Sequence, residues 1–418
     1  MRIFKFGGAS VKDAESVRNI PGILSKYKGD DLVVIVSAMG KTTNALEALA
    51  GSAFNKDASK EKLFADIKAY HQGIAEALFP DKAHDLYKHF DMLFRELEGW
   101  IHTDNTYDYD MYYDQIVPYG ELLSTRIISY YLNESGLKEK WMDVRELIIT
   151  DSTYRSAKVD WDATSKRITE RVKPEIMMGN MVISQGFIAG NGHYSTSLGR
   201  EGSDFTSAIF AHILDAEEVI VWKDVPGYLN ADPKFFDDTV KLDRISYTES
   251  IELAFYGAKI IHPKTIRPLK NKRIPLLVKS FLEPDAPGSL IYEDISSDAL
   301  VPSFIVKENQ VLISISSRDF SFIAEDHLHK IFGLFSTHRV RINLMQNSAI
   351  SFSVCTDNTA RLKVLIEELQ KGFRLKYNDE LQLVTIRHYD EETIDRLSGG
   401  KEILLEQRSR VTVQMVIK

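Results

Sequence analysis

The sequence contains a single cysteine, Cys355, among its 418 residues. One chain therefore cannot form an internal disulfide or a cysteine-based metal cluster, and we expect a reducing, cytoplasmic environment. Long hydrophobic runs are also missing, since the most apolar stretch covers only residues 32–39, far fewer than a bilayer-spanning helix needs. The opening MRIFKFGGAS has no apolar segment of signal-peptide length, so secretion is not expected.

Basic residues are not in excess either. The formal net charge is -8 and the sequence pI is about 5.8. A protein that neutralises a nucleic-acid backbone or an anionic membrane surface needs the opposite balance, so the sequence predicts neither partner. Hydrophobic residues make up 44% of the chain, which is enough for the cores of two or three domains.

Short runs of Val, Ile and Phe followed by glycine mark the N-terminal half. Residues 3–6 precede Gly7-Gly8, and residues 32–37 precede Gly40. Such runs are typical of strands buried on both faces, which predicts a mostly parallel sheet between two helical layers, an α/β/α fold. Further strands are predicted at 181–184, 218–221 and 276–279, and helices at 121–133, 203–214, 247–256 and within 56–100.

Proline, glycine, serine and acidic residues cluster at 283–303 and predict a boundary between a first domain, 1–295, and a C-terminal region, 296–418. The C-terminal region begins with a unit over about 310–378 in βαββαβ order, the ferredoxin-like arrangement. The tail, 379–418, repeats part of this pattern but lacks one strand. Residues 304–307, within 300–309, could donate that strand.

The turn after the first strand has the composition of a phosphate-binding loop. Lys5 ends the strand, and Gly7, Gly8 and Ser10 lead into an apparent helix start. Glycines let the backbone approach a ligand, and free N–H groups at a helix N-terminus attract anions. A tight turn with a solvated lysine would explain the same residues, so both interpretations stay open at this point.

A complete P-loop is absent from residues 37–44, SAMGKTTN. The letters GKT match the end of that motif, but Ile35 stands where its first glycine is required. Ser37 and Thr43 remain candidates as hydroxyl donors to a ligand, because ligands bind at the carboxyl ends of strands in α/β sheets.

Charged residues accompany two predicted helix starts. In SLGREGSDF, residues 197–205, Arg200 could hold a carboxylate in a two-pronged grip. Asp204 could either cap the following helix or orient neighbouring cations. Glu121, in PYGELLS, is also open to two interpretations, because a glutamate in the first turn of a helix often only complements the helix dipole.

Two later segments mix turn formers with charged residues. Residues 221–235, VWKDVPGYLNADPKF, carry Lys223, Asp224 and Lys234, and GAKIIHP carries Lys259. A loop of this kind after an apolar strand can receive a nucleotide, and it can equally be a surface turn with solvated charges. For His262, packing or capping is the expected role.

Taken together, these segments resemble the aspartate kinase branch of the amino-acid kinase superfamily over nearly the whole chain. KFGGAS is similar to the family's KFGGTS signature, SLGREGSDF to its GRGGSD motif, and VSAMGKTTN to its substrate-binding strand and loop. DVPGYLNADP and GAKIIHP resemble later stretches of aspartate kinases. The tail resembles two ACT domains, one inserted within the other, and no homoserine dehydrogenase follows, so a monofunctional enzyme is implied.

The resemblance implies transfer of the ATP γ-phosphate to the β-carboxylate of L-aspartate, the first step toward lysine, threonine and methionine. ATP and Mg²⁺ are the implied cofactors, with the ion held largely by phosphates and water. By position, catalysis would fall to Lys5 and Asp204, and aspartate binding to Ser37, Thr43, Glu121 and Arg200. The nucleotide would be surrounded by Lys5, Gly7, Gly8, Ser10, Ser203, Lys223, Asp224, Lys234 and Lys259.

Six positions depart from the residues that are usual in the family. With the usual residue in parentheses, they are Ala9 (Thr), Glu201 (Gly), Phe205 (Tyr), Lys223 (Thr or Ser), Leu229 (Tyr) and Lys234 (Arg). Leu229 loses an aromatic hydroxyl, and Lys234 lacks the planar fork of an arginine. These changes concern the details of the nucleotide pocket.

The tail further implies regulation by an amino-acid effector, bound between ACT units at the interface of a homodimer or higher homo-oligomer. The resemblance places this ligand at Asn343, Gln346, Asn347 and Ser348. Lysine-sensitive relatives often have an acidic residue at the Asn343 position, so lysine and threonine both remain open. The tail could also serve dimerisation alone.

Three alternatives to an aspartate kinase are considered. The first is another amino-acid kinase, acting on glutamate or acetylglutamate, and the second is a non-catalytic amino-acid sensor with a kinase-like domain. The third, a dinucleotide-binding oxidoreductase, lacks the required G-x-G-x-x-G after the first strand.

Overall fold

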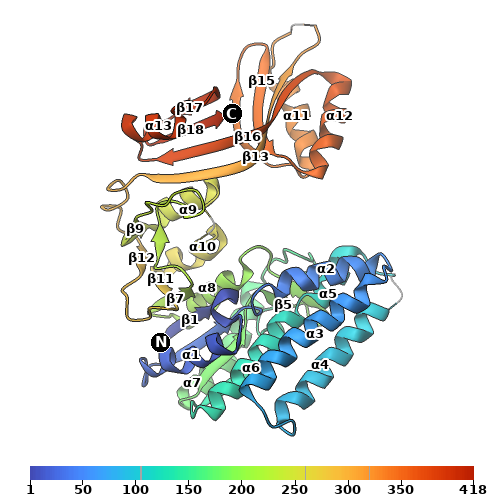
Figure 1. Ribbon diagram of the computed structural model, residues 1–418, viewed down its shortest axis with the longest axis vertical. Coiled ribbons are helices and arrows are strands. Elements are labelled where there is room, and N and C mark those ends of the chain that lie inside the picture. Colours follow the sequence, from blue (N-terminus) through green and yellow to red (C-terminus); the bar gives the residue numbers. More distant parts are fainter. Residues whose placement is uncertain (104–105, 259, 320) are drawn as a thin grey trace. The chain divides into compact units, whose positions relative to one another are not determined.

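The computed structural model describes residues 1–103, 106–258, 260–319 and 321–418 (Figure 1). The chain folds into two compact units. The first contains Met1–Tyr228, Asp243–Ile251 and Ile260–Asp294, and the second contains Leu229–Leu242, Glu252–Lys259 and Ile295–Lys418. Two short segments that precede residue 295 thus group with the C-terminal part of the chain.

An eight-stranded sheet forms the centre of the first unit. Neighbouring strands are parallel except for β11 and β12, which are antiparallel. The middle strand β1 pairs with β2 and β7, so that Lys5 lies beside Ile35 and Val221. In order across the sheet the strands are β10 (Arg244–Ser246), β12 (Ser289–Tyr292), β11 (Leu276–Ser280), β7 (Glu218–Lys223), β1 (Arg2–Phe6), β2 (Leu32–Val36), β4 (Met181–Gln185) and β3 (Glu139–Met142).

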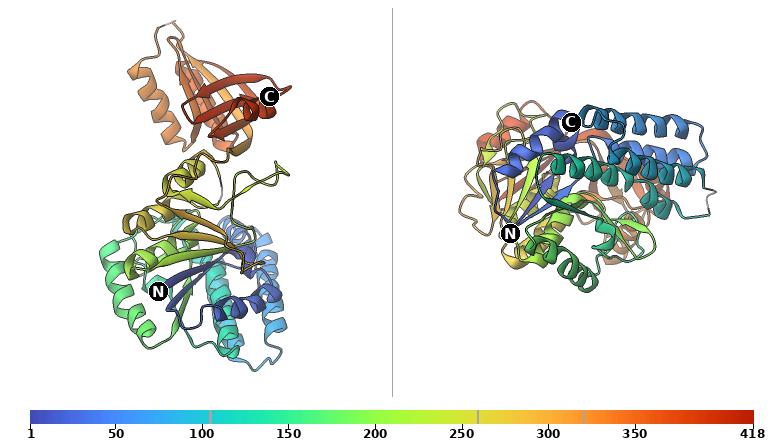
Figure 2. Two further views of the ribbon diagram at one scale, coloured as in Figure 1. Left: turned by 90° about the vertical axis from the view of Figure 1, so that its left-hand side faces the viewer. Right: turned by 90° about the horizontal axis from the view of Figure 1, so that it is seen from below.

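Helices cover both faces of this sheet, which confirms the predicted α/β/α fold (Figures 1 and 2). One layer holds α7 (Trp161–Met177), α8 (Gly202–Leu214) and α10 (Pro263–Lys272). The opposite layer holds α1 (Ala14–Ser25) and α6 (Tyr119–Glu134), with four further helices packed outside it. These four are α2 (Thr42–Phe54), α3 (Ser59–Leu78), α4 (Asp85–His102) and α5 (Tyr109–Ile116).

Several short elements were not predicted. They are the 3-10 helices η1 (Gly8–Val11) and η2 (Val144–Glu146), the hairpin β5 (Ile188–Gly190) and β6 (Ser195–Ser197), and the strands β8 (Tyr228–Leu229) and β9 (Lys241–Leu242). Each spans four residues or fewer, too short for a periodic pattern to identify it. The predicted helix at 247–256 is present as α9 (Tyr247–Tyr256).

The second unit is built on a six-stranded antiparallel sheet in the order β14-β15-β13-β16-β18-β17. Two long strands, β13 (Ser303–Ser316) and β16 (Arg374–Arg387), run through both halves. The remaining elements are α11 (Glu325–Thr337), β14 (Ile342–Asn347), β15 (Ser351–Asp357), α12 (Ala360–Gly372), α13 (Glu391–Ser398), β17 (Ile403–Arg408) and β18 (Thr412–Ile417).

This sheet confirms the two predicted ferredoxin-like halves. The later part of β13 pairs with residues 374–378, within the βαββαβ half covered by α11 and α12. The start of β13 pairs with the end of β16, Phe304 opposite Ile386, so residues 304–307 supply the strand that the tail lacks. Separate apolar cores fill the two halves.

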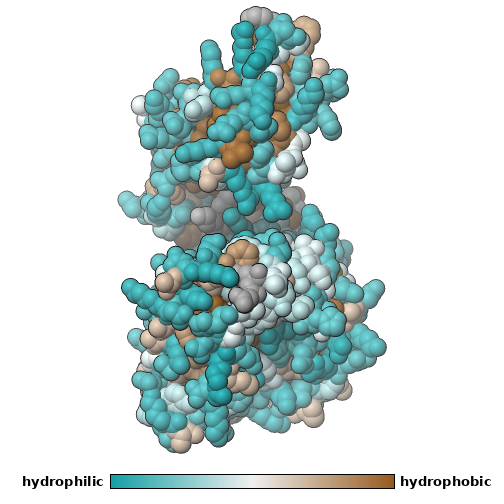
Figure 3. Space-filling model, turned by 90° about the vertical axis from the view of Figure 1, so that its right-hand side faces the viewer, coloured by the Kyte–Doolittle hydropathy of each residue, from teal (hydrophilic) through white to brown (hydrophobic). Residues whose placement is uncertain are grey.

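Apolar side chains also reach the surface of the second unit, between charged ones (Figure 3). Met345, Tyr377 and Ile403 are each 40% or more exposed.

None of the helices in the described part of the chain is long and apolar enough to span a membrane.

Candidate active site

A buried carboxylate with two ammonium groups marks the carboxyl ends of β1 and β7. Asp204 lies in the first turn of α8, and its Oδ1 atom is 2.7 Å from Nζ of Lys5. Its Oδ2 atom is 3.7 Å from Nζ of Lys223, at the end of β7. The side chains of Lys5 and Asp204 are only 9% and 3% exposed. Asp204 thus orients cations, one of the two roles that the sequence left open.

The two lysines keep Asp204 ionised. Burial by itself would raise the pKa of this carboxyl group, but the positive charges of Lys5 and Lys223 outweigh burial and hold the pKa below its usual value. Removing one partner of such a buried pair leaves an uncompensated charge, which is strongly unfavourable. The cluster therefore holds two ammonium groups in fixed positions at one edge of the sheet.

The glycine turn after β1 is in close contact with the turn after β2. A Cβ atom on Gly8 would lie 2.9 Å from the carbonyl oxygen of Ala38, and the backbone N–H of Gly40 donates to the Gly8 carbonyl at 3.0 Å. Only glycine fits at this position. Ser10 donates its hydroxyl to the Trp222 carbonyl at 3.1 Å, so it joins the turn to β7.

The N-terminus of α8 faces the same region. The helix begins at Gly202, whose N–H donates to the Gly199 carbonyl at 3.0 Å, and no described side chain caps its first turn. Ser203, in this first turn, is buried. Uncapped N–H groups carry partial positive charge, and Lys5 and Lys223 add full charges, so this edge of the sheet is suited to bind phosphate oxygens.

Glu121 is a second buried carboxyl group. It lies in the first turn of α6 and is 2% exposed. Its Oε1 atom accepts a hydrogen bond from the Ala38 backbone N–H at 3.2 Å, whereas Oε2 has no hydrogen-bond partner among the described residues. Burial raises the pKa of Glu121 to about 8, although the Ala38 N–H group and Lys5 oppose the shift. A residue that served only the helix dipole would not need this burial.

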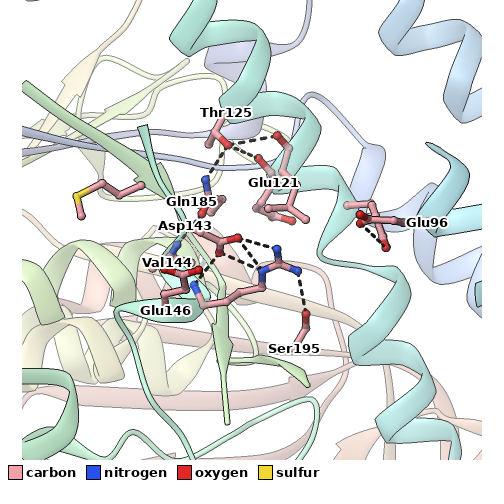
Figure 4. Close-up of polar contacts among 12 residues, drawn as sticks. Glu96, Glu121, Thr125, Asp143, Val144, Glu146, Gln185 and Ser195 are labelled. Carbon is pink, nitrogen blue, oxygen red and sulfur yellow. Dashed lines mark hydrogen bonds and ion pairs between the residues drawn. The ribbon is translucent and has the colours of Figure 1, made fainter. Parts of the chain in front are cut away.

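A hydrogen-bond chain holds the helix that carries Glu121 (Figure 4). One turn further along α6, the hydroxyl oxygen of Thr125 accepts a hydrogen bond from the Gln185 amide at 2.9 Å. The amide oxygen of Gln185 in turn accepts from the Val144 backbone N–H at 2.8 Å. Ser124 donates its hydroxyl to the Ser37 carbonyl at 2.8 Å, which ties α6 to the end of β2.

The other predicted aspartate ligands lie on neighbouring segments. Ser37 directly follows β2, and its backbone N–H donates to the Phe6 carbonyl at 3.1 Å. Thr43 is half-buried in the first turn of α2. Arg200 precedes α8 and is exposed, and it forms no ion pair with another described residue. The backbone thus places all three near the ends of β1 and β2 and the start of α8.

The predicted nucleotide ligands separate into three groups. Lys223 belongs to the charge cluster, and Asp224 beside it is exposed. Lys234 belongs to the second unit, where its ammonium group pairs with Glu308 at 2.7 Å. Lys259 lies outside the described residues. His262 has the expected capping role, because its Nδ1 atom accepts a hydrogen bond from the Lys264 N–H at the start of α10.

Asp114 is a buried site residue that the sequence analysis missed. Its carboxylate accepts hydrogen bonds from the Ser197 hydroxyl at 2.6 Å and from the backbone N–H groups of Ser197 and Arg155 at 2.9 and 2.8 Å. Burial raises the pKa of Asp114 to about 6 against these hydrogen bonds. Ser197 opens the SLGREGSDF segment, so Asp114 fixes the base of the loop that carries Arg200. The two partners are 83 residues apart, and no local pattern connects them.

Two surface cavities of about 390 and 540 Å³ lie elsewhere in the first unit. Both are lined by Arg145, His193, Tyr194 and Ser195, and neither includes a predicted site residue. Arg145 is already held by hydrogen bonds to Asp143 and Ser195. The chemistry of the side chains therefore favours the charge cluster over these two cavities as the active site.

The predicted effector residues lie on and after β14 in the second unit. Asn343 accepts a hydrogen bond from Lys307 at 3.0 Å, and it donates to Gln310 and Asp357 at 2.8 and 2.9 Å. Gln346 and Asn347 are exposed at the end of the strand. The Ser348 hydroxyl is hydrogen-bonded to Ser351.

The chain was compared with known proteins. Residues 1–280 match the model of the amino acid kinase family. The chain is 29% identical to lysine-sensitive aspartokinase 3 of Escherichia coli, over 96% of this chain and 89% of the relative. It is 31% identical to chloroplastic aspartokinase 1 of Arabidopsis thaliana, over 88% of this chain and 67% of the relative.

Solved structures agree with the sequence comparison. E. coli aspartokinase III in complex with aspartate and ADP superposes with a TM-score of 0.83 at 26% identity, covering 100% of this chain and 96% of that one. The likeness extends over both compact units. The chain therefore belongs to the amino acid kinase family and, within it, to the aspartokinases, which are ATP-dependent kinases.

Proposed function

We propose that this chain transfers the γ-phosphoryl group of ATP to the β-carboxylate of L-aspartate and forms 4-phospho-L-aspartate. One observation carries the proposal: the buried Asp204 carboxylate holds Lys5 and Lys223 beside the uncapped start of α8. The E. coli relative, whose structure contains aspartate and ADP, supports the same pair of ligands.

The phosphate end of ATP fits the edge of the sheet at β1 and β7. Lys5, Lys223 and the N–H group of Ser203 offer positive charge and hydrogen-bond donors. The turn at Gly7 and Gly8 lets the backbone come close to the phosphates. Ser10 contributes to this turn through its bond to Trp222, and Asp224 lies next to Lys223.

Aspartate would occupy the neighbouring edge at β2. The unpartnered Oε2 atom of Glu121 is suited to accept the α-ammonium group of the substrate. Arg200, which lacks an ion-pair partner among the described residues, would hold a substrate carboxylate in a bidentate grip. The hydroxyl groups of Ser37 and Thr43 would complete the contacts.

Phosphoryl transfer needs little covalent help from the protein. A β-carboxylate oxygen of aspartate attacks the γ-phosphorus, the bond to the bridging oxygen breaks, and ADP leaves with that electron pair. Because the substrate carboxylate is ionised at neutral pH, no general base has to remove a proton. Lys5 and Lys223 would stabilise the charge on the γ-phosphoryl oxygens, and Asp204 would keep both ammonium groups in place.

Magnesium fits this site as a companion of ATP. The described residues contain no cluster of three His, Cys, Asp or Glu side chains that could ligate a metal, so the ion would be held mainly by phosphate oxygens and water. When bound, it shields the negative charge of the triphosphate.

We further propose that the second unit regulates the kinase. An amino-acid effector would bind near Asn343, Gln346, Asn347 and Ser348, at an interface between copies of the chain. The exposed apolar side chains of this unit and the free edge of β14 support self-association. The name of the E. coli relative favours lysine, whereas the uncharged Asn343 leaves threonine open. The product would then feed the synthesis of lysine, threonine and methionine.

Residues 255–257 contact the predicted effector region within the second unit. Arg341, just before β14, donates a hydrogen bond to the Phe255 carbonyl at 2.9 Å. Lys307, the partner of Asn343, packs against Gly257, where a Cβ atom would lie 2.6 Å from the lysine side chain. A change at β14 on effector binding would therefore act on residues 255–257.

The function is tested by release of ADP from Mg-ATP with aspartate, glutamate or acetylglutamate as acceptor. We expect turnover with aspartate alone. Lys5→Ala should lower kcat by roughly 10³-fold or more, because it removes a cation from the transition state. Lys166→Ala, which truncates an exposed lysine on α7, is the matched control and should behave like wild type.

Each other result has a definite meaning. Turnover with glutamate or acetylglutamate would identify another amino-acid kinase, and no turnover with any acceptor would favour the non-catalytic sensor. Inhibition by added lysine or threonine would identify the effector. Absence of both inhibition and binding would leave the second unit with dimerisation alone.

A further inference from the structure

Helix α3 brings a histidine to the turn that follows β2. His71 lies on α3, which packs against α2, and its side chain is fully buried (Figure 1). Its Nε2 atom is 3.4 Å from the hydroxyl oxygen of Thr42, the first residue of α2. A histidine that only filled the core would need no polar contacts, whereas His71 uses both of its ring nitrogens.

The tautomer of His71 follows from these two contacts. Its Nδ1 atom is 2.8 Å from the carbonyl oxygen of Ile67, which can only accept, so Nδ1 carries the proton. Burial lowers the pKa of His71 to about 4, and the ring is therefore neutral at pH 7. The Nε2 atom then has a free lone pair and can accept a hydrogen bond from the Thr42 hydroxyl group.

The Thr42 hydroxyl group lies between two acceptors. It donates to the Met39 carbonyl at 2.6 Å, and the Nε2 atom of His71 lies 3.4 Å from the same oxygen. Threonine in a helix divides between two side-chain rotamers, because its hydroxyl can bond to backbone carbonyls. Two acceptors around one hydroxyl group select one of these rotamers.

The methyl group of Thr42 faces the helix that carries Glu121. A Cβ atom on Gly120 would lie 3.3 Å from Cγ2 of Thr42 and 2.9 Å from Cβ of Ala38. The backbone N–H of Ala38 also donates to Glu121 at 3.2 Å. Because another rotamer would exchange the methyl and hydroxyl groups, the Thr42 side chain sets how closely α6 and the turn after β2 approach each other.

The residue before His71 contacts the same part of the molecule. The Tyr70 hydroxyl donates to the carbonyl of Lys12, which follows η1, and a Cβ atom on Gly40 would lie 2.7 Å from the Tyr70 hydroxyl oxygen. The N–H of Gly40 in turn donates to the Gly8 carbonyl at 3.0 Å. Two consecutive residues of α3 thus contact the turns that follow β1 and β2.

We propose that His71 is a positioning residue for the acceptor substrate. By accepting a hydrogen bond from Thr42, its Nε2 atom holds the turn after β2 so that Thr43 and Glu121 meet the same substrate molecule. His71 itself forms no bond to the substrate and transfers no proton. This inference rests on the proposed kinase function and gives α3 a role in acceptor binding.

Steady-state kinetics of full-length variants test the proposal. His71→Leu removes the acceptor at similar volume and should raise KM for aspartate about 10-fold, while KM for ATP stays nearly unchanged. His71→Gln, whose amide oxygen can accept at the Nε2 position, should keep KM for aspartate within about 3-fold of wild type. An equal rise in both variants would show that the lone pair of His71 has no function, and the proposal would fail.

A matched control separates positioning from lost packing. Phe64 lies on the same helix, and its ring packs against Phe94. Phe64→Leu should lower Tm, because it leaves a gap in the core, but KM for aspartate should stay at the wild-type value. If Phe64→Leu raises this KM as much as His71→Leu does, general loosening of α3 explains both effects and the proposal is overturned.

A double-mutant cycle tests the contact itself. Thr42→Val keeps the branched shape that faces Gly120 but removes the hydroxyl group, so it should also raise KM for aspartate about 10-fold. The double variant of Thr42→Val and His71→Leu should lose no more than either single variant, because both remove the same hydrogen bond. Losses that multiply to about 100-fold would show that the two residues act independently and would overturn the proposal.

Acceptor binding provides a readout that needs no turnover. Calorimetric titration with L-aspartate in the presence of Mg-ADP should show the same order of losses in Kd. If wild type binds aspartate without phosphorylating it, the proposed reaction is wrong, and the Kd series still decides the role of His71. If wild type turns over aspartate and Kd is unchanged in every variant, the kinase function stands and the role of His71 is overturned.

Discussion

Two polar sites, one in each unit, differ in how far their side chains are hydrogen-bonded within the described residues. In the first unit, Glu121 keeps a buried carboxylate oxygen with no hydrogen-bond partner among the described residues. In the second unit, the Asn343 side chain uses its oxygen for Lys307 and its nitrogen for Gln310 and Asp357.

An oxygen atom of Glu121 is thus still available to a ligand, whereas the Asn343 side chain is already hydrogen-bonded within the second unit. A buried polar atom without a partner costs free energy, so it persists where a ligand supplies the missing interaction. A fully bonded network instead makes the local structure rigid. We therefore expect substitutions of Glu121 and of the Asp204 charge cluster to change catalysis, and substitutions around Asn343 to change stability and the response to an effector.

Among substitutions of the buried carboxyl groups, the largest effect is expected from Asp204→Asn. The amide cannot hold two ammonium groups by charge, so Lys5 and Lys223 would lose their positions and kcat should fall about 10³-fold. Asp215→Asn, at the other end of the same helix, is the control, because its carboxylate is exposed and pairs with Lys272. Steady-state kinetics together with a thermal melt measure both variants. An active Asp204→Asn enzyme would remove the charge cluster from the mechanism.

Glu121→Gln should act on the substrate side of the site. Losing a charged partner for the substrate ammonium group should raise KM for aspartate about 10- to 100-fold and leave KM for ATP nearly unchanged. Glu98→Gln, an exposed position on α4, provides the comparison. An equal rise in both KM values would show that Glu121 supports the fold of the site and does not bind aspartate.

The same residue predicts a pH dependence. The usual pKa of a glutamate is 4.5, and burial raises that of Glu121 to about 8, so the folded protein holds this proton through neutral pH. Only the ionised carboxylate pairs with an ammonium group, so kcat/KM for aspartate should rise with pH up to about 8.

The stability of the folded protein should change with pH in the opposite direction to kcat/KM. The contribution of Glu121 to stability is fully present below pH 4.5 and is lost as the pH rises through 8. Glu121→Gln should therefore make both kcat/KM for aspartate and the free energy of unfolding less dependent on pH. A profile for kcat/KM that keeps its rise near pH 8 in this variant would assign the ionisation to another group.

The smallest catalytic effect is expected in the second unit. Asn343→Ala leaves Lys307, Gln310 and Asp357 without their shared partner, which should lower the free energy of unfolding by about 1–3 kcal/mol. In the absence of effector, kcat should stay near the wild-type value. Denaturant unfolding checks the first point, with Asn378→Ala, an exposed asparagine on β16, as the control. A large loss of kcat without loss of stability would contradict the comparison.

Much of the fold could be predicted from the sequence. Runs such as residues 32–36 are apolar throughout, and parallel strands buried on both faces require this composition. The missing strand of the tail could be predicted because a ferredoxin-like half with three strands leaves one edge unpaired. The short hairpin of β5 and β6 could not be predicted, because polar segments of three residues carry no period.

Only part of the candidate active site could be predicted from the sequence. Lys5 and Asp204 stand in recognisable motifs, but the motifs do not show that one carboxylate holds two lysines from different strands. Lys223 and Lys234 are close in the sequence, yet they belong to different compact units. Asp114 gave no usable signal, since its role depends on partners brought together by folding.

The sequence by itself determined the layered α/β architecture, the ferredoxin-like tail and the family, because apolar patterning and short motifs are local properties of the chain. Only the tertiary structure decided which charges meet. The Lys5–Asp204 pair joins residues from β1 and α8, and Lys223 reaches the same carboxylate from β7. Burial then sets which carboxyl groups are ionised, and burial is a property of the packed molecule that no single segment encodes.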